Sequence, residues 1–242
     1  MRPLVVFIMG LVVLTPLSAG ATERTVGAAA FSEAPRIDGI LDDSVWSSAS
    51  PATGFVQIEP QFGEPSPFRT EVLVGYTEEA LFVAFRCFDP EPDQLSAAIT
   101  SRDGDLQDDD SVTLLLDTFD DGRRAYFFAT NTLGVQQDGK VADNGRVVDL
   151  KWDASWFSAA SKTEEGWTAE FEIPFEILKF RGGEITTWGI NAHRSVPRRL
   201  ETSMWSGPAE SKWRVSAFGE LNGLQFGSST AGGSGTLPGV AS

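Results

Sequence analysis

Histidine and cysteine are almost absent from this chain of 242 residues, which contains one of each. A lone cysteine cannot form an internal disulfide, and Cys87 lies in an apolar run, so we expect a buried, unreactive thiol. Zinc sites need several His or Cys ligands, which one histidine and one cysteine cannot supply. We therefore expect His193 to pack within a strand, and we exclude disulfide scaffolds and the common zinc sites.

Long apolar segments are missing beyond the first residues. The run from Leu4 to Leu14 is shorter than the roughly 18 apolar residues that a membrane-spanning helix needs, and no later segment reaches that length. Arg2 precedes this run and Ala19-Gly20-Ala21 follows it, which is typical of a cleaved secretory leader. We predict a signal peptide over 1–21, no transmembrane segment in the mature chain, and export to the periplasm, cell surface or medium.

Basic residues are few, because 19 Lys and Arg stand against 34 Asp and Glu, for a formal net charge of −15. Removal of the predicted leader takes away Arg2 and no acid, which leaves 18 basic side chains and a charge of about −16. Such a field repels phosphate backbones and anionic lipid headgroups, so we exclude nucleic acid as a partner. Neutral sugars and divalent cations are compatible with it.

Common enzyme motifs are missing as well. The chain has no Gly-x-Ser-x-Gly elbow, no phosphate-binding loop and no dinucleotide fingerprint. A hydrolase would have to use paired carboxylates, and with 34 acids some pair at glycosidase separation arises by chance. Glu170 alternates with apolar neighbours, so we expect it to face solvent or a basic residue on the next strand. We predict a non-catalytic protein and keep a glycoside hydrolase as the weakest alternative.

Short runs of β-branched and aromatic residues, separated by turn residues, fill the body of the chain, as in β-sandwiches. Three hairpins are predicted, which pair 71–76 with 81–85, 112–116 with 125–130, and 156–161 with 167–173. Pro174 ends the last of these strands, a helical turn is expected over 175–178, and extended structure resumes over 187–192. The predicted fold class is an all-β, antiparallel, jelly-roll-like sandwich with short helical turns.

A change of composition marks the end of the predicted domain. Residues 227–242 are rich in Gly, Ser, Thr and Ala and contain no charged side chain, so we expect a flexible tail. The stretch between the leader and Phe226 is long enough for one all-β sandwich. We therefore predict one domain over 22–226.

The segment from Asp38 to Trp46 reads Asp-Gly-Ile-Leu-Asp-Asp-Ser-Val-Trp. It resembles the opening of carbohydrate-binding module family 9, and further resemblances follow in order at 80–90, 109–117, 166–175, 188–191 and 218–221. Together they cover roughly residues 30–224. The resemblance implies a β-sandwich that binds a glycan or polysaccharide. We expect Trp46 to pack in a short helical turn over the sandwich edge, and Trp167 and Trp188 to lie in the core.

Four more segments resemble a subgroup of this family found at the N-terminus of bacterial outer-membrane β-barrel proteins. They are Phe55-Val56-Gln57 with Pro60, Arg102-Asp103, 134–139, and Trp152-Asp153 with Trp156. The chain stops before any barrel segment, so a freestanding domain and a fragment both stay open. This subgroup suggests a second hypothesis, a structural or protein-interaction module that binds an envelope protein.

The family resemblance implies a clamp in which two tryptophans sandwich the terminal sugar and polar side chains hold its hydroxyls. Trp213 falls at the position of the second tryptophan, Gln107 replaces the first, and Phe128 stands where the family has a sugar-contacting arginine. Half of the clamp is missing, so we expect a rebuilt aromatic surface. Its other candidate residues are Trp152, Trp156, Trp205, Arg194, Arg198 and Glu201.

An acidic loop precedes the predicted strand over 112–116. Its five carboxylates belong to Asp103, Asp105, Asp108, Asp109 and Asp110. Calcium takes about six to eight oxygen ligands and tolerates irregular loops, and the family resemblance implies structural calcium. We therefore predict a candidate structural calcium site, with solvated loop charges as the alternative.

Overall fold

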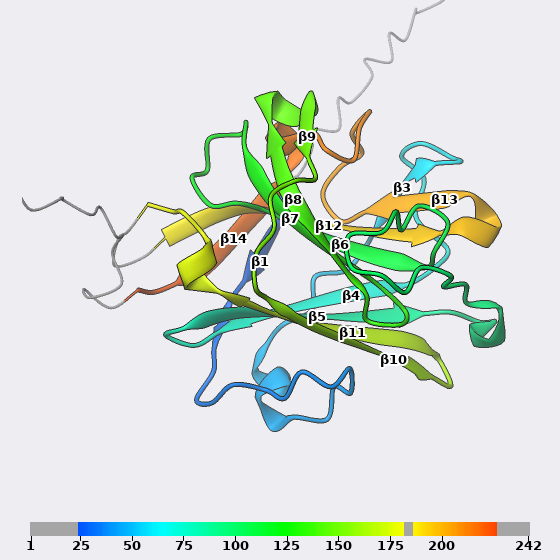
Figure 1. Cartoon of the computed structure of the whole chain (residues 1–242), viewed down its shortest axis with the longest axis horizontal. Coiled ribbons are helices and arrows are strands. Elements are labelled where there is room, and N and C mark those ends of the chain that lie inside the picture. Colours follow the sequence, from blue (N-terminus) through cyan, green and yellow to red (C-terminus); the bar gives the residue numbers. More distant parts are fainter. Residues whose placement is uncertain (1–23, 182–185, 227–242) are drawn as a thin grey trace, which may run out of the picture.

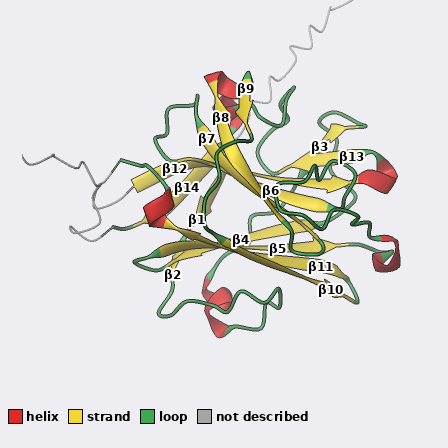
Figure 2. Cartoon of the chain, in the orientation of Figure 1, coloured by secondary structure: helices red, strands yellow, loops and turns green. Residues whose placement is uncertain are grey.

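A computed structural model describes residues 24–181 and 186–226, which fold into two facing β-sheets (Figures 1 and 2). The predicted leader over 1–21 and the predicted tail over 227–242 lie outside the described residues. No helix in the described part of the chain is long and apolar enough to cross a membrane. The helical segments described are short 3-10 turns: η1 (Ser44–Ser48), η2 (Pro92–Gln94), η3 (Asp143–Gly145), η4 (Phe175–Ile177), η5 (Pro197–Arg199) and η6 (Val215–Ala217).

The larger sheet has nine strands. Seven of them follow the order β1-β14-β12-β6-β7-β8-β9, and β13 pairs with both β12 and β3 at one side. Their bounds are β1 (Thr25–Gly27), β3 (Val56–Glu59), β6 (Ser111–Asp117), β7 (Ala125–Asn131), β8 (Gln136–Ala142), β9 (Val147–Asp149), β12 (Thr186–Val196), β13 (Glu201–Met204) and β14 (Gly219–Leu224).

The smaller sheet has five strands in the order β10-β11-β5-β4-β2. Their bounds are β2 (Ala29–Ala30), β4 (Thr70–Tyr76), β5 (Ala80–Phe88), β10 (Phe157–Thr163) and β11 (Gly166–Pro174). The three predicted hairpins are confirmed as the antiparallel pairs β4–β5, β6–β7 and β10–β11. The short strands β1 and β2 differ, because each joins its sheet in parallel, to β14 and β4 respectively.

The core lies between the sheets and follows the two-residue period of each strand. On β6, Val112, Leu114 and Leu116 face the smaller sheet and are fully buried. Trp167 and Trp188 are 1 % and 0 % exposed, which confirms their predicted place in the core. Cys87 belongs to the same core, so the expectation of a buried thiol is confirmed, and burial raises the pKa of this thiol to about 12.

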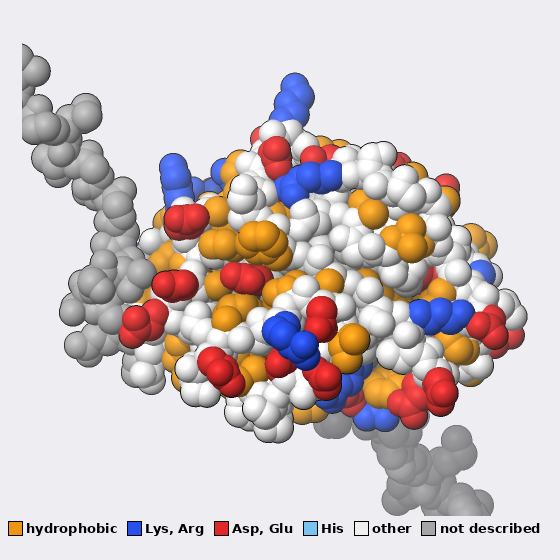
Figure 3. Space-filling model, turned by 60° about the horizontal axis from the view of Figure 1, so that its bottom comes forward, with side chains coloured by type: hydrophobic (Ala, Val, Ile, Leu, Met, Phe, Trp, Pro, Cys, Tyr) orange, Lys and Arg blue, Asp and Glu red, His pale blue; other side chains and the backbone are white. Residues whose placement is uncertain are grey.

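The opening segment of the resemblance covers the outer face of the smaller sheet. Trp46 lies in η1, is 2 % exposed, and packs edge-on against Phe31 at 5.2 Å between ring centroids. Leu73, Phe82 and Ala84 form the sheet surface beneath it. Trp46 is therefore packed as predicted, although it covers a face of the sandwich and not its edge. Figure 3 views this side, where acidic and basic side chains are interspersed with scattered apolar patches.

Glu170 of β11 holds that opening segment in place. Its carboxylate is buried and accepts hydrogen bonds from Trp46 Nε1 at 2.9 Å and from the backbone N–H groups of Gly39 at 2.8 Å and Asp38 at 3.1 Å. Gly39 has φ +83°, and an added Cβ would come within 2.6 Å of the Ala160 carbonyl carbon. The expectation that Glu170 faces solvent or a basic residue is wrong, because three N–H donors of the opening segment surround it.

Candidate functional site

The seven tryptophans differ sharply in exposure. Five of them, Trp46, Trp156, Trp167, Trp188 and Trp205, are at most 4 % exposed. Trp152 and Trp213 are half-buried. The structure thus removes Trp156 and Trp205 from the predicted aromatic surface, because a ring sealed in the core cannot stack on a sugar.

Trp213 lies on the outer face of the larger sheet, in the segment that joins β13 to β14. Its ring packs on Phe127 of β7, with ring centroids 5.0 Å apart. Leu115 and Val141 belong to the same cluster on this face, which is separate from the main core. The Lys212 ammonium lies 5.0 Å from the centroid of the Trp213 ring. The sheet therefore supports one side of the indole while part of the side chain stays open to solvent.

Phe128 points away from this surface. It is 0 % exposed and packs in the main core, since successive residues of a strand face opposite sides. Its neighbour Phe127 faces Trp213 instead. Phe128 is therefore not available for contact with a sugar on the surface that carries Trp213.

The loop that carries Gln107 reaches the same outer face. Gln137 Nε2, on the outer side of β8, donates to the Gly104 carbonyl at 2.9 Å, and Asp105 accepts from the Gln107 backbone N–H at 3.1 Å. Asp105 also acts electrostatically on Lys212. Desolvation lowers the pKa of this lysine overall, and the Asp105 carboxylate opposes the shift. Gln107 itself is exposed. The structure thus places the Gln107 loop beside the Trp213 segment, as the family resemblance implies.

His193 lies beneath Lys212 on β12. It is 3 % exposed, and neither ring nitrogen has a hydrogen-bond partner among the described residues. Burial lowers the pKa of His193 to about 3, and the charge of Lys212 acts in the same direction. The imidazole is therefore neutral near pH 7 and too weakly basic for general-base work there. This agrees with the expectation that it packs within a strand.

Arg194, Arg198 and Glu201 do not join Trp213. Arg194 points inward and is 1 % exposed, and its Nη1 donates to Phe88 O at 3.0 Å and to Thr70 Oγ1 at 3.1 Å. Arg198 Nη2 lies 2.6 Å from Asp89 Oδ1, and Glu201 accepts a hydrogen bond from Ser66 while only 3 % exposed. These groups tie together one end of the sandwich, so the predicted glycan contact for them is not supported.

Trp152 closes the side of the core near β8. Its ring centroid is 5.0 Å from that of Tyr126 and 6.0 Å from that of Phe128, and the Lys140 ammonium lies 4.8 Å from it. The indole therefore covers the inward-facing aromatic residues of β7. It is half-exposed but lies apart from the surface that carries Trp213.

The five acidic side chains of the 103–110 loop do not converge. Asp109 is buried and accepts from the Ala98 N–H at 2.7 Å, the Ile99 N–H at 3.1 Å and Asn131 Nδ2 at 2.8 Å. Asp110 is buried too and accepts from Ser96 N–H at 2.8 Å. Among the residues described, no three His, Cys, Asp or Glu side chains are grouped to hold a metal ion. The buried pair is used by N–H donors, and Asp103, Asp105 and Asp108 are exposed. The calcium site stays a prediction.

Several residues of the subgroup resemblance meet in one polar network that sequence reasoning missed. Arg102 Nη2 lies 2.7 Å from Asp138 Oδ1 and 2.8 Å from Asp153 Oδ1. Trp156 Nε1 donates to the same Asp138 oxygen at 3.1 Å, and the Ala154 N–H donates to Asp138 Oδ2 at 3.1 Å. Asp138 is buried on β8, so this network joins the acidic loop and the 152–156 segment to the larger sheet.

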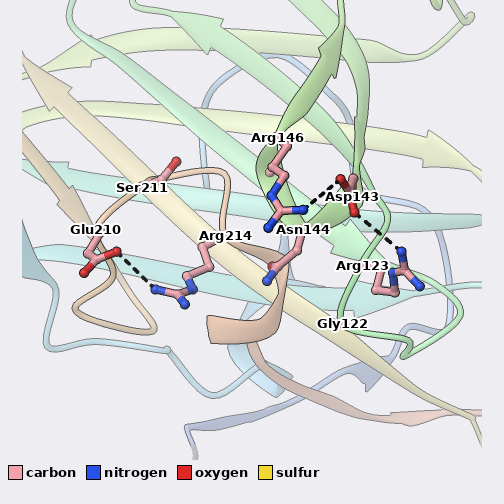
Figure 4. Close-up of a pocket in the computed structure, with 9 residues that line it drawn as sticks. Gly122, Arg123, Asp143, Asn144, Arg146, Glu210, Ser211 and Arg214 are labelled. Atoms are coloured by element: carbon pink, nitrogen blue, oxygen red, sulfur yellow. Dashed lines mark hydrogen bonds and ion pairs between the residues drawn. The ribbon is translucent and has the colours of Figure 1, made fainter.

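A hollow of about 450 Å³ lies next to Trp213, between three turns (Figure 4). Its lining was not predicted, because the residues come from segments far apart in sequence. They are Gly122 and Arg123 from the β6–β7 turn, Asp143, Asn144 and Gly145 of η3 with Arg146 directly after it, and Glu210, Ser211 and Arg214 from the Trp213 segment.

Comparison with known families decides the classification. A family model described as carbohydrate family 9 binding domain-like matches residues 37–223. The chain belongs to this family. None of the curated protein sequences matches it.

Solved structures with the fold of this family 9 domain include two of a family 9 carbohydrate-binding module from Caldicellulosiruptor kristjanssonii. The complex with cellotriose has a TM-score of 0.63 and 16% identity, and the match covers 86% of this chain and 97% of that one. The complex with glucose has a TM-score of 0.63 and 17% identity, and the match covers 82% of this chain and 95% of that one. A putative carbohydrate-binding protein from Bacteroides uniformis ATCC 8492 has a TM-score of 0.66 and 14% identity, covering 83% and 99%. These likenesses confirm the β-sandwich fold of the family 9 domain.

Proposed function

We propose that this family 9 domain binds a glycan, without catalysis, on the surface that Trp213 forms over the larger sheet. The observation that carries the proposal is the half-exposed Trp213 ring, supported on the sheet by Phe127 and bordered by Lys212. Flat aromatic surface suits the C–H faces of a pyranose, and polar groups beside it replace the water around the hydroxyls. Solved structures of the same fold contain cellotriose and glucose, which supports β-linked glucose oligosaccharides as first probes.

The proposed site has one aromatic wall. Gln107 lies in the loop beside the Trp213 segment, and it offers an amide where the family resemblance implies a second ring. An aromatic contact contributes about 0.5–1.5 kcal/mol, so the loss of one wall weakens binding by roughly threefold to tenfold relative to a two-ring clamp. We therefore expect weak binding of a single sugar and stronger binding of a longer chain that also contacts the polar hollow.

The absence of catalysis is part of the proposal and is supported by how the acids are used. Glu170 and Asp138 are buried, and each accepts several N–H hydrogen bonds from the protein itself. His193 is neutral and sealed under the Trp213 segment. None of these groups is presented to a ligand on the Trp213 surface.

Export is also part of the proposal, and so is membership of the outer-membrane subgroup. The support for export is the sequence pattern of 1–21, and the support for the subgroup is its set of motif residues, several of which meet at Asp138. A domain at the cell surface would meet extracellular polysaccharide directly. An envelope protein is the competing partner.

Titration calorimetry against mono-, oligo- and insoluble polysaccharides tests the proposal. Trp213→Ala should weaken binding of the best ligand by roughly threefold to tenfold, because the stacking surface is removed. Trp152→Phe is the matched control, since Trp152 is also half-buried and beside a lysine but lies elsewhere. Equal binding by Trp213→Ala and the parent would contradict the proposal. So would capture of an envelope protein that sugars do not compete with, in the absence of any sugar binding.

A further inference from the structure

The hollow beside Trp213 concentrates positive charge on a chain that is otherwise strongly acidic. Three guanidinium groups, of Arg123, Arg146 and Arg214, meet two carboxylates, of Asp143 and Glu210. Figure 4 shows Arg146, Asp143 and Arg123 on one side, Arg214 and Glu210 on the other, and Asn144 between them. The lining thus carries an excess of one positive charge, against −15 for the whole chain.

The guanidinium groups keep most of their donors available. Arg123 Nη2 and Arg146 Nη1 lie 3.5 Å and 3.3 Å from the two oxygens of Asp143, and Arg214 Nη1 lies 3.5 Å from Glu210. These are long contacts between exposed side chains, and such pairs contribute little. A guanidinium has about five N–H donors, so a single long contact leaves most of them for an incoming oxygen.

The walls of the hollow are held together by Asn144. Its backbone N–H donates to Arg123 O at 2.9 Å, its Oδ1 accepts from the Ser216 N–H at 2.9 Å, and its Nδ2 donates to Ser216 Oγ at 3.0 Å. Gly145, at φ +92°, packs so closely that an added Cβ would lie 2.5 Å from the Trp213 carbonyl oxygen. These contacts tie the backbone of Arg123, through η3, to the Trp213 segment.

We propose that this hollow receives an anionic group of the bound glycan, a carboxylate or a sulfate ester, on a sugar residue next to the one that stacks on Trp213. The inference rests on the proposed function and narrows its ligand class to glycans that carry isolated acidic groups. Arginine pairs with carboxylate and sulfate oxygens through two parallel N–H···O bonds, which a neutral sugar hydroxyl cannot match in strength. The acidic remainder of the chain disfavours polyanions that lack a fitted contact, so this selects single charged groups over nucleic acid.

The direct test compares three ligands that share one backbone, using the full chain. They are cellotriose, the same trisaccharide oxidised to carboxylate at C6, and the same trisaccharide sulfated at C6. We expect at least one of the charged trisaccharides to bind about tenfold more tightly than cellotriose at low salt, and the advantage to shrink as salt is raised. The charged ligand that binds more tightly identifies the anion.

Two variants localise the effect. Arg123→Gln and Arg146→Gln together should remove the preference for the charged ligand, so that the double variant binds the charged trisaccharide no more tightly than it binds cellotriose. Arg199→Gln is the matched control, because Arg199 is also exposed and also paired with one carboxylate, Glu91, but lies on η5. The side chains of Arg123 and Arg146 are at least 70% exposed, so the double variant should keep its fold, which a thermal melt verifies.

The failure of this inference and that of the proposed function give different results. If cellotriose binds through Trp213 but neither anion improves binding, or Arg199→Gln reduces the preference as much as the double variant, the acidic-glycan inference is overturned and glycan binding stands. If no trisaccharide binds, both are overturned. A preference for the anion that the double variant removes supports the inference.

Discussion

At the scale of single residues, the sequence predicts which face of a sheet a side chain points to only where apolar residues alternate regularly along the strand. Val112, Leu114 and Leu116 point into the core as their spacing indicates, and Trp167 is buried as expected. Where charged and aromatic residues follow one another along a strand, the sequence does not show which of them points inward. His193 and Arg194 are adjacent yet point to opposite sides of the sheet. Arg194, which the sequence suggested as a glycan contact, is buried and donates hydrogen bonds inside the sandwich. Its burial depends on acceptors on β4 and β5, which no local pattern reveals.

His193 gives a prediction about pH at this scale. Its folded pKa is about 3 against an ordinary value of 6.5, so between these values the unfolded chain binds a proton that the folded chain does not. The free energy of unfolding therefore decreases as the pH is lowered through this window. At pH 4.5 the loss due to His193 is about 2–3 kcal/mol relative to pH 7. Lys212 is the charged group that faces it.

His193→Leu should remove that part of the acid sensitivity, because it leaves the other titrating groups in place. Urea unfolding of the parent and the variant at pH 7 and pH 4.5 measures this effect. On acidification the parent should lose about 2–3 kcal/mol more unfolding free energy than the variant loses. A difference that does not change with pH would show that the imidazole is not buried in its neutral form.

Glu170 gives a second prediction at this scale. Glu170→Gln leaves one carbonyl oxygen for three N–H donors and turns an NH2 group toward them, so the chain should lose about 2–3 kcal/mol of stability. Glu172→Gln, on the same face of β11 and half-buried beside Glu79, should change stability by about 0.5 kcal/mol or less. Denaturant melts of both variants measure this. Equal losses would mean that Glu170 does not anchor the opening segment.

At the scale of elements, hairpins were predictable and the loops that hold the site were not. The pairs β4–β5, β6–β7 and β10–β11 follow from local alternation and turn residues. The network around Asp138 joins positions 102, 138, 153 and 156, and the hollow joins three turns, so both depend on how distant strands are ordered in the larger sheet. Resemblance marked several of these residues as a set, but only coordinates show what they contact.

Arg102 tests the role of this network. Arg102→Ala leaves the buried Asp138 carboxylate without its cation, so we expect a loss of about 2–3 kcal/mol in unfolding free energy. Faster amide exchange should appear at 152–156 first, because Ala154 and Trp156 bind the same carboxylate. Lys162→Ala breaks an exposed pair with Asp93 and should cost about 0.5 kcal/mol or less. Unchanged exchange at 152–156 would show that the network does not hold this segment.

At the scale of the whole molecule, the sandwich seals five of its seven tryptophans and leaves Trp213 on an outer face. The family was predictable because its resemblances are spread along the chain, and the family model matches residues 37–223. The position of the proposed site on the outer face of the larger sheet was not predictable, since it requires the register that turns Phe127, and not Phe128, toward Trp213.

An NMR titration of the indole N–H signals shows directly whether a glycan binds at the Trp213 ring, because each tryptophan gives its own signal. Cellotriose and its charged counterparts are added to the full chain, and the Trp213 signal is assigned with Trp213→Phe. We expect a saturable shift of the Trp213 signal and little change in the signals of the five buried tryptophans. Saturable binding that leaves the Trp213 signal in place, or that shifts Trp152 alone, would contradict this expectation.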